Sequence, residues 1–341
     1  MSLSAKTASD LEWGGLLDQL ASRCTSSDGA ERARSIVPES TPEAARVRIR
    51  RTAEALELAS RGDIIPITGV VDMGDFVARL ARDAVATALE LHALRQLLRT
   101  ALTLRRFAHA RRDTHPALAA ALSSDASLDR LLDTLDHAID PDGGLSDHAS
   151  TDLGHARRKA GDMRQRVISR LEELISRYAE VLQDRYYTVR DGRYVLPVRS
   201  DSHIRVPGIV LGSSASGATL FIEPRAVMAL GNQLKVAMAD VEREEARVLI
   251  ELSDRARREV ELIERAWESC VDADVIAATV RLADAMHAIS VDLDPEPVLS
   301  LRAVRHPLLA LANSEVAAND LEVRAGSVLV ISGPNAGGKT V

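Results

Sequence analysis

The sequence has few aromatic residues, few cysteines and no long hydrophobic run. Phe, Trp and Tyr make up 3% of the 341 residues, and because strands favour aromatic and β-branched side chains, this argues against a mainly β fold. Cys24 and Cys270 lack metal-ligand spacing, which predicts two small core residues in a reducing compartment rather than a zinc site. No apolar run reaches the length of a membrane span and no signal-peptide pattern is present, so we predict a cytoplasmic protein with no membrane partner.

The net charge of −7 excludes a chain that is coated by nucleic acid over its whole surface. Any contact with a polyanion must therefore be local. Hydrophobic residues make up 46% of the chain, which is ample for two or three domains with cores of their own. The abundance of Ala, Leu, Arg and Glu predicts that helices dominate these domains.

The first 145 residues carry a series of helix start and stop signals. An apolar stripe begins at Asp10, and a second helix is predicted from Asp28 to the residue before Pro38. Thr41-Pro42-Glu43 has the pattern of an N-cap, an N1 proline and a first-turn acid. Thr87 and Glu90 form a capping-box pattern that opens a long amphipathic helix. We predict a helical core over residues 1–145.

Two long helices with a coiled-coil seam follow this core. Apolar residues recur at alternating steps of three and four from Leu153 to Val181, and again from Val227 to Trp267, where Glu244 interrupts the seam. Three short strands bounded by Gly, Pro and Ser are predicted between them, at residues 193–198, 207–211 and 217–222. We therefore predict an antiparallel lever, with an ascending helix at 146–189, a small β clamp at 190–224, a descending helix at 225–268 and a connector helix at 269–294.

Local charge indicates a polyanion contact near the clamp. The segment from Thr151 to Ser200 carries eleven Lys or Arg against seven Asp or Glu, a local charge of +4 in an acidic chain. Basic side chains and hydroxyl groups there could meet a phosphate backbone, whereas an ordinary solvated tip is the alternative. Nothing resembles a sequence-reading helix. The candidate contact residues are Arg190, Arg193, Arg199, His203, Arg205, Ser214 and Ser216.

Residues 295–341 have the pattern of the start of an α/β domain. Strands are predicted at 298–303 and 321–324, a loop at 305–309, and a buried strand from Val328 to Ile331. A glycine-rich loop follows this last strand, and its glycines allow backbone N–H groups to turn inward around phosphates. Lys339, one of only four lysines, would reach the outer phosphates, and Thr340 would offer its hydroxyl to Mg²⁺. The nucleotide-binding candidates are Gly333, Pro334, Asn335, Ala336, Gly337, Gly338, Lys339 and Thr340.

The order of these parts resembles that of the MutS-type ATPases. Those proteins combine a helical core, a lever interrupted by a clamp, an Arg305-His306-Pro307-Leu308-Leu309 approach and a GPNxGGKT loop. The tip from Gly208 to Pro224, and the absence of an N-terminal mismatch-reading domain, are similar to the bacterial MutS-two branch. The fold expected is therefore mainly α, with a helical core, a long antiparallel coiled-coil lever with a small β clamp at its tip, and the truncated start of a P-loop ATPase domain.

The resemblance implies an ATP- and Mg²⁺-dependent homodimer whose levers and clamps embrace a large nucleic-acid target. That target would be branched DNA, in suppression of recombination, or a collided ribosome and its rRNA, in rescue of translation. Val316 falls where the family lines the adenine pocket. The family's Walker B acid, signature loop and nuclease domain have no counterpart in the sequence, so we expect neither ATP hydrolysis nor nuclease chemistry from this chain by itself. The alternative is a non-enzymatic coiled-coil module that binds DNA or a protein.

Overall fold

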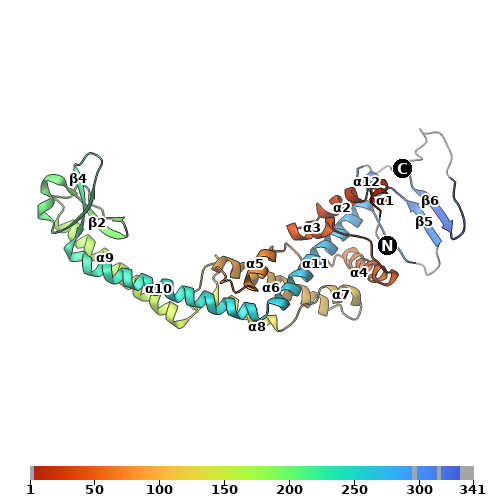
Figure 1. Cartoon of the computed structure of the whole chain (residues 1–341), viewed down its shortest axis with the longest axis horizontal. Coiled ribbons are helices and arrows are strands. Elements are labelled where there is room, and N and C mark those ends of the chain that lie inside the picture. Colours follow the sequence, from red (N-terminus) through yellow and green to blue (C-terminus); the bar gives the residue numbers. More distant parts are fainter. Residues whose placement is uncertain (1–3, 294–297, 313–315, 331–341) are drawn as a thin grey trace. The chain divides into compact units, whose positions relative to one another are not determined.

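A computed structural model describes residues 4–293, 298–312 and 316–330, and the chain forms two compact units (Figure 1). Unit 1 comprises residues 1–84, 93–132 and 256–341, and unit 2 comprises residues 85–92 and 133–255. Helices dominate both units and the described sheets are small, as the composition predicts. No helix among the described residues is long and apolar enough to cross a membrane.

The helices of unit 1 begin at the residues that the sequence marks. Thr41 caps α4 (Pro42–Ser60) by accepting a hydrogen bond from the Ala44 amide, with Pro42 in the first turn. The capping box that opens α6 (Ala88–His109), whose first residues belong to unit 2, is also present, since Thr87 and Glu90 exchange hydrogen bonds. The remaining helices of this unit are α1 (Ala5–Asp10), α2 (Trp13–Ala21), α3 (Ser27–Arg34), α5 (Gly74–Leu80), α7 (Pro116–Ala121), α11 (Val260–Met286) and α12 (Pro307–Ala312).

A buried carboxylate connects α11 to the N-terminal helices within unit 1. Asp274 of α11 is fully buried, and its carboxylate accepts hydrogen bonds from the backbone amides and hydroxyls of Thr25 and Ser26 at 2.7–2.9 Å. Ser26 is also the N-cap of α3. Gly29 leaves room for this carboxylate, because a Cβ at that position would lie 2.4 Å from Asp274 Oδ2. Burial of a charge is tolerated here because both carboxylate oxygens accept hydrogen bonds.

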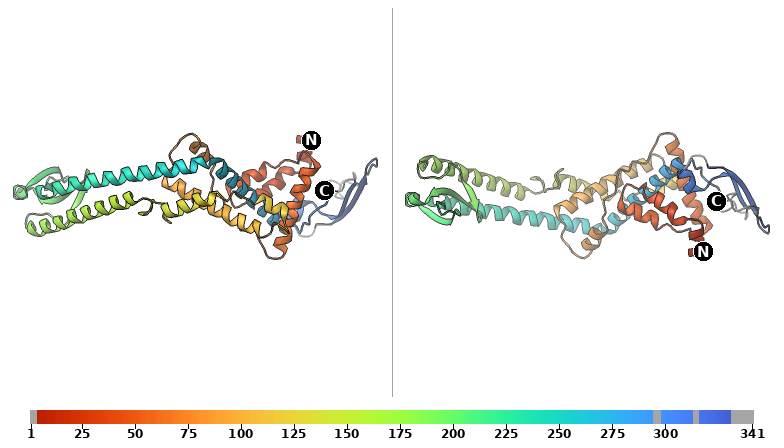
Figure 2. Two further views of the ribbon diagram at one scale, coloured as in Figure 1. Left: turned by 90° about the horizontal axis from the view of Figure 1, so that it is seen from below. Right: turned by 90° about the horizontal axis from the view of Figure 1, so that it is seen from above.

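The lever of unit 2 consists of α9 (Thr151–Arg177) and α10 (Arg225–Arg258), which lie side by side in both views of Figure 2. Buried residues of the predicted seam, among them Val167, Leu171 and Leu234, form one hydrophobic cluster. Where acidic residues interrupt the seam, ion pairs connect the helices instead. These are Lys159–Asp240, Arg157–Glu245 and Arg247–Asp152, at 3.3, 2.8 and 2.7 Å. Unit 2 also includes most of α8 (Leu128–Ala138).

The clamp is an antiparallel sheet with the strand order β1-β2-β4-β3. The three predicted strands are present as β2 (Arg193–Arg199), β3 (Gly208–Ser213) and β4 (Thr219–Pro224), with a 3-10 turn, η1 (Ser200–Arg205), after β2. Leu196, Val198 and Ile222 bury one face of the sheet against α9 and α10. β1 (Thr188–Arg190) was not predicted, although the Asp191-Gly192 turn, with φ of 49° and 68°, is a strong hairpin signal.

The C-terminal segment confirms two predicted strands and corrects two other predictions. The strands predicted at 298–303 and 321–324 are present as β5 (Val298–Val304) and β6 (Asn319–Arg324), and the structure pairs them antiparallel. The predicted loop at 305–309 is wrong, because Pro307 and the helix-forming residues after it begin α12. The described part of the predicted strand from Val328 is not in a strand. Val328 is 86% exposed, since no described strand pairs with this segment.

Candidate nucleotide and nucleic-acid sites

The predicted phosphate loop lies outside the described residues. Gly333, Pro334, Asn335, Ala336, Gly337, Gly338, Lys339 and Thr340 all fall in this part of the chain. Their chemistry fits a nucleoside triphosphate with Mg²⁺, because the set supplies glycine amides, one ammonium group and one hydroxyl. Val316 is described and half-buried just before β6, outside regular structure. Its place in an adenine pocket stays a prediction.

Two of the candidate contact residues on the clamp are held by partners within the sheet. Arg193 donates to the carboxylate of Glu223 at 2.8 Å, and the Glu223 side chain is only 3% exposed. The Arg190 guanidinium stacks on the Phe221 ring, 3.5 Å from its centroid. Both arginines therefore contribute to the packing of the clamp.

The other candidates lie at the end of β2, on η1 and on the turn between β3 and β4. Arg199 pairs with Asp201 at 2.7 Å, and Arg205 lies 3.9 Å from Glu180, with all four side chains at least half exposed. Exposed pairs of this kind are weak and exchange readily for a phosphate. His203 Nδ1 lies 2.7 Å from the Ser200 carbonyl oxygen. On the other turn, Ser214 Oγ accepts from the Thr219 amide and lies 3.3 Å from Ser216 Oγ.

The structure adds a group of cations that the sequence analysis did not single out. Each is exposed and makes no ion pair with any other described residue, so each is available to an outside anion. The signal for them was the local excess of positive charge between Thr151 and Ser200. They are Arg158, Arg164, Arg166 and Arg177 on α9, and Arg185 before β1.

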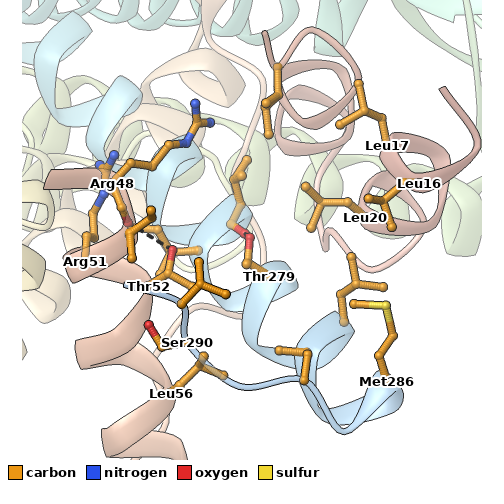
Figure 3. A pocket seen from close by; sticks show the side chains of 18 of the residues that line it. Leu16, Leu17, Leu20, Arg48, Arg51, Thr52, Leu56, Thr279, Met286 and Ser290 are labelled. Atoms are coloured by element: carbon orange, nitrogen blue, oxygen red, sulfur yellow. Dashed lines mark hydrogen bonds between the residues drawn. The ribbon is translucent and has the colours of Figure 1, made fainter. Parts of the chain in front are cut away.

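A separate apolar cavity of about 570 Å³ lies in unit 1 (Figure 3). Leu16, Leu17 and Leu20 of α2 line one side, and α4 and α11 supply the others. The arginines at its edge are engaged, since Arg48 pairs with Glu39 at 2.7 Å while Arg32 and Arg51 face Asp272. The lining therefore offers apolar surface rather than the converging free polar groups of a catalytic site.

Both cysteines lie in surroundings that keep the thiol protonated. No group of His, Cys, Asp and Glu with metal-binding geometry occurs in the described part of the chain. Burial, with the nearby Asp274 carboxylate, raises the pKa of the half-buried Cys24 thiol to about 11, and burial raises the pKa of Cys270 to about 12. Both thiols are therefore protonated at neutral pH, as expected of inert core cysteines.

We expect both cysteines to react slowly with a disulfide reagent in the native protein at pH 8. A rise of two pKa units lowers the thiolate fraction of Cys24 roughly a hundredfold, and the thiolate is the reacting species. The measurement is the rate of thionitrobenzoate release before and after denaturation in guanidinium, with Cys24→Ser to separate the two thiols. Rapid release of one equivalent from the native protein would contradict this.

Sequence comparisons place the chain among known proteins, although no protein-family model matches it. It is 34% identical over 355 residues to Endonuclease MutS2 of Anaeromyxobacter sp. (strain Fw109-5), which covers 99% of this chain and 44% of that protein. It is also 34% identical to Endonuclease MutS2 of Pelotomaculum thermopropionicum over 99% of this chain, and to that of Shouchella clausii over 97%. The chain thus spans less than half the length of these curated relatives, 43–44% of each. Over nearly its whole length it belongs to the MutS2 family.

Proposed function

We propose that this chain is an ATP- and Mg²⁺-binding, nucleic-acid-clamping protein of the MutS type. The observation that carries the proposal is a glycine-rich loop with Lys339 and Thr340, in a chain that matches MutS2 proteins from end to end. Gly333 to Thr340 would hold the triphosphate and Mg²⁺. Binding of this charged ligand would stabilise one conformation of the protein relative to another. The lever and clamp would grip the target.

The structure supports the clamping part of this proposal through the layout of unit 2. A lever with a β clamp at its tip presents unpaired cations on α9 and weakly paired ones at the end of β2 and on η1. Phosphate contacts of this kind give affinity without sequence preference. The target proposed is DNA, branched in recombination, or an rRNA-containing ribosome, and the acting form proposed is a cytoplasmic homodimer.

The test of nucleotide binding is Lys339→Ala. Loss of the ammonium group removes a charge partner of the outer phosphates, so we expect affinity for Mg²⁺ and a non-hydrolysable ATP analogue to fall at least tenfold. Lys235→Ala is the control, because it removes another of the four lysines far from the loop in sequence. The measurement is isothermal titration calorimetry of the wild type and both variants.

The same proteins then distinguish a nucleotide-regulated clamp from a coiled-coil module that binds nucleic acid independently of nucleotide. In the proposed function, the analogue changes the affinity of the wild type for a branched DNA or an rRNA fragment, and Lys339→Ala abolishes this change. Nucleic-acid binding that is identical with and without the analogue would leave a coiled-coil binding module instead. Absence of any nucleotide binding by the wild type would end the proposal.

A further inference from the structure

α12 lies beside α2 in unit 1, and the two make a specific contact (Figure 1). Leu308 of α12 packs on Gly15 of α2 so closely that a Cβ added to Gly15 would lie 3.1 Å from Leu308 Cδ1. Leu311, one turn further along α12, packs against the cluster that contains Leu20 and Leu282. The start of the C-terminal segment therefore packs on both α2 and α11.

A polar contact accompanies this packing. His306 Nε2 lies 3.5 Å from a carboxylate oxygen of Glu12, while the buried His306 Nδ1 has no hydrogen-bond partner among the described residues. Glu12 precedes α2 in the left-handed region, with φ of 49°, a conformation that residues other than glycine rarely adopt. Glu12, which lies between α1 and α2, thus has a strained backbone and contacts His306, which precedes α12, β6 and the phosphate loop in the sequence. Backbone strain that is retained at a contact between two segments indicates a conformational switch at that contact.

We infer that α2 and α12 form a latch through which the nucleotide-binding end of the chain moves the N-terminal helices. This inference rests on the proposed function and adds the route by which nucleotide reaches the core. The latch consists of Leu308 on Gly15 and of His306 against Glu12. Its components come from distant parts of the sequence, so a shift of β5 and β6 would move α2 through the non-covalent contacts of α12. Without these contacts, the shift would reach the core only through the covalent connection to α11.

Two adjacent glycines of α2 provide a matched pair of variants. Gly15→Leu places a Cβ 3.1 Å from Leu308 Cδ1, so that Leu308 must shift and its packing on α2 is disturbed, whereas Gly14 has no atom within 4 Å of its added Cβ. Gly14→Leu makes the same change in helix propensity without touching α12. We expect Gly15→Leu to increase amide hydrogen exchange at least tenfold over residues 307–312, and Gly14→Leu to leave it unchanged. Equal exchange in both variants would overturn the docking.

A second measurement tests transmission. Addition of Mg²⁺ with a non-hydrolysable ATP analogue should change exchange over α2 and α3 in the wild type and in Gly14→Leu, but not in Gly15→Leu. The affinity for the analogue should stay within twofold in all three proteins. An unchanged response in Gly15→Leu would overturn the latch while leaving nucleotide binding intact. Failure of the wild type to bind the analogue would instead overturn the proposed function and transmission with it, and the exchange rates of α12 alone would then decide the docking.

Discussion

Asp274→Ala is expected to lower the free energy of unfolding of unit 1 by about 4 kcal/mol, the largest single effect on stability that the structure predicts. The carboxylate accepts hydrogen bonds from two amides and two hydroxyls, and Arg281 lies 3.5 Å away. Hydrogen bonds to a charged group contribute about 1.5–3 kcal/mol each, and buried donors left without an acceptor add their own cost. Because these contacts are coupled, their separate contributions do not add in full.

Urea unfolding followed by circular dichroism, with hydrogen exchange over α3 to assign the transition to unit 1, measures this effect. Asp272 provides the matched control, since it lies two residues earlier on α11 and its side chain is 39% exposed. Asp272→Ala should cost less than about 1 kcal/mol, as exposed ion pairs do. Equal losses in the two variants would show that the buried network does not carry this stability.

Local signals predicted most of the helices and strands. Thr41 and the Thr87–Glu90 box mark helix starts within a few residues, and the three-four spacing of Val167, Leu171 and Leu174 marks the seam of the lever. The prediction of a loop at 305–309 was wrong for a local reason, because Pro307 is as suitable for a first helical turn as for a loop.

Contacts between distant residues could not be predicted from the sequence. Asp274 and Thr25 are 249 residues apart, and no periodicity relates them. The same limit applies to the clamp, where local charge makes Arg193 a candidate phosphate contact but cannot reveal its ion-pair partner. Its partner Glu223 lies on β4, opposite β2, and only the register of the sheet brings the two side chains together. The loop from Gly333 to Thr340 is the opposite case, since its chemistry is carried by adjacent residues.

Arg193→Ala is expected to destabilise the clamp by about 3 kcal/mol. The substitution leaves the Glu223 carboxylate, 3% exposed, without its charged partner, and breaking a buried pair from one side is costly. Arg199→Ala is the matched control at the other end of β2, because its pair with Asp201 is exposed on both sides and contributes little to stability. Hydrogen exchange over residues 193–199 and 219–224 measures both. A loss for Arg193→Ala no larger than that for Arg199→Ala would refute the structural role of Arg193.

The structural role of Arg193 decides how nucleic-acid binding by the clamp must be tested. A variant of Arg193 that loses binding has also lost the packing of β2 on β4, so its affinity says nothing about a phosphate contact. Removing both charges, in Arg193→Ala with Glu223→Ala, should recover part of the stability because no buried carboxylate is left unpaired. If the recovered double variant binds as the wild type does, while Arg166→Ala and Arg177→Ala weaken binding and its salt dependence, then the phosphate contacts lie on α9 and Arg193 supports the fold.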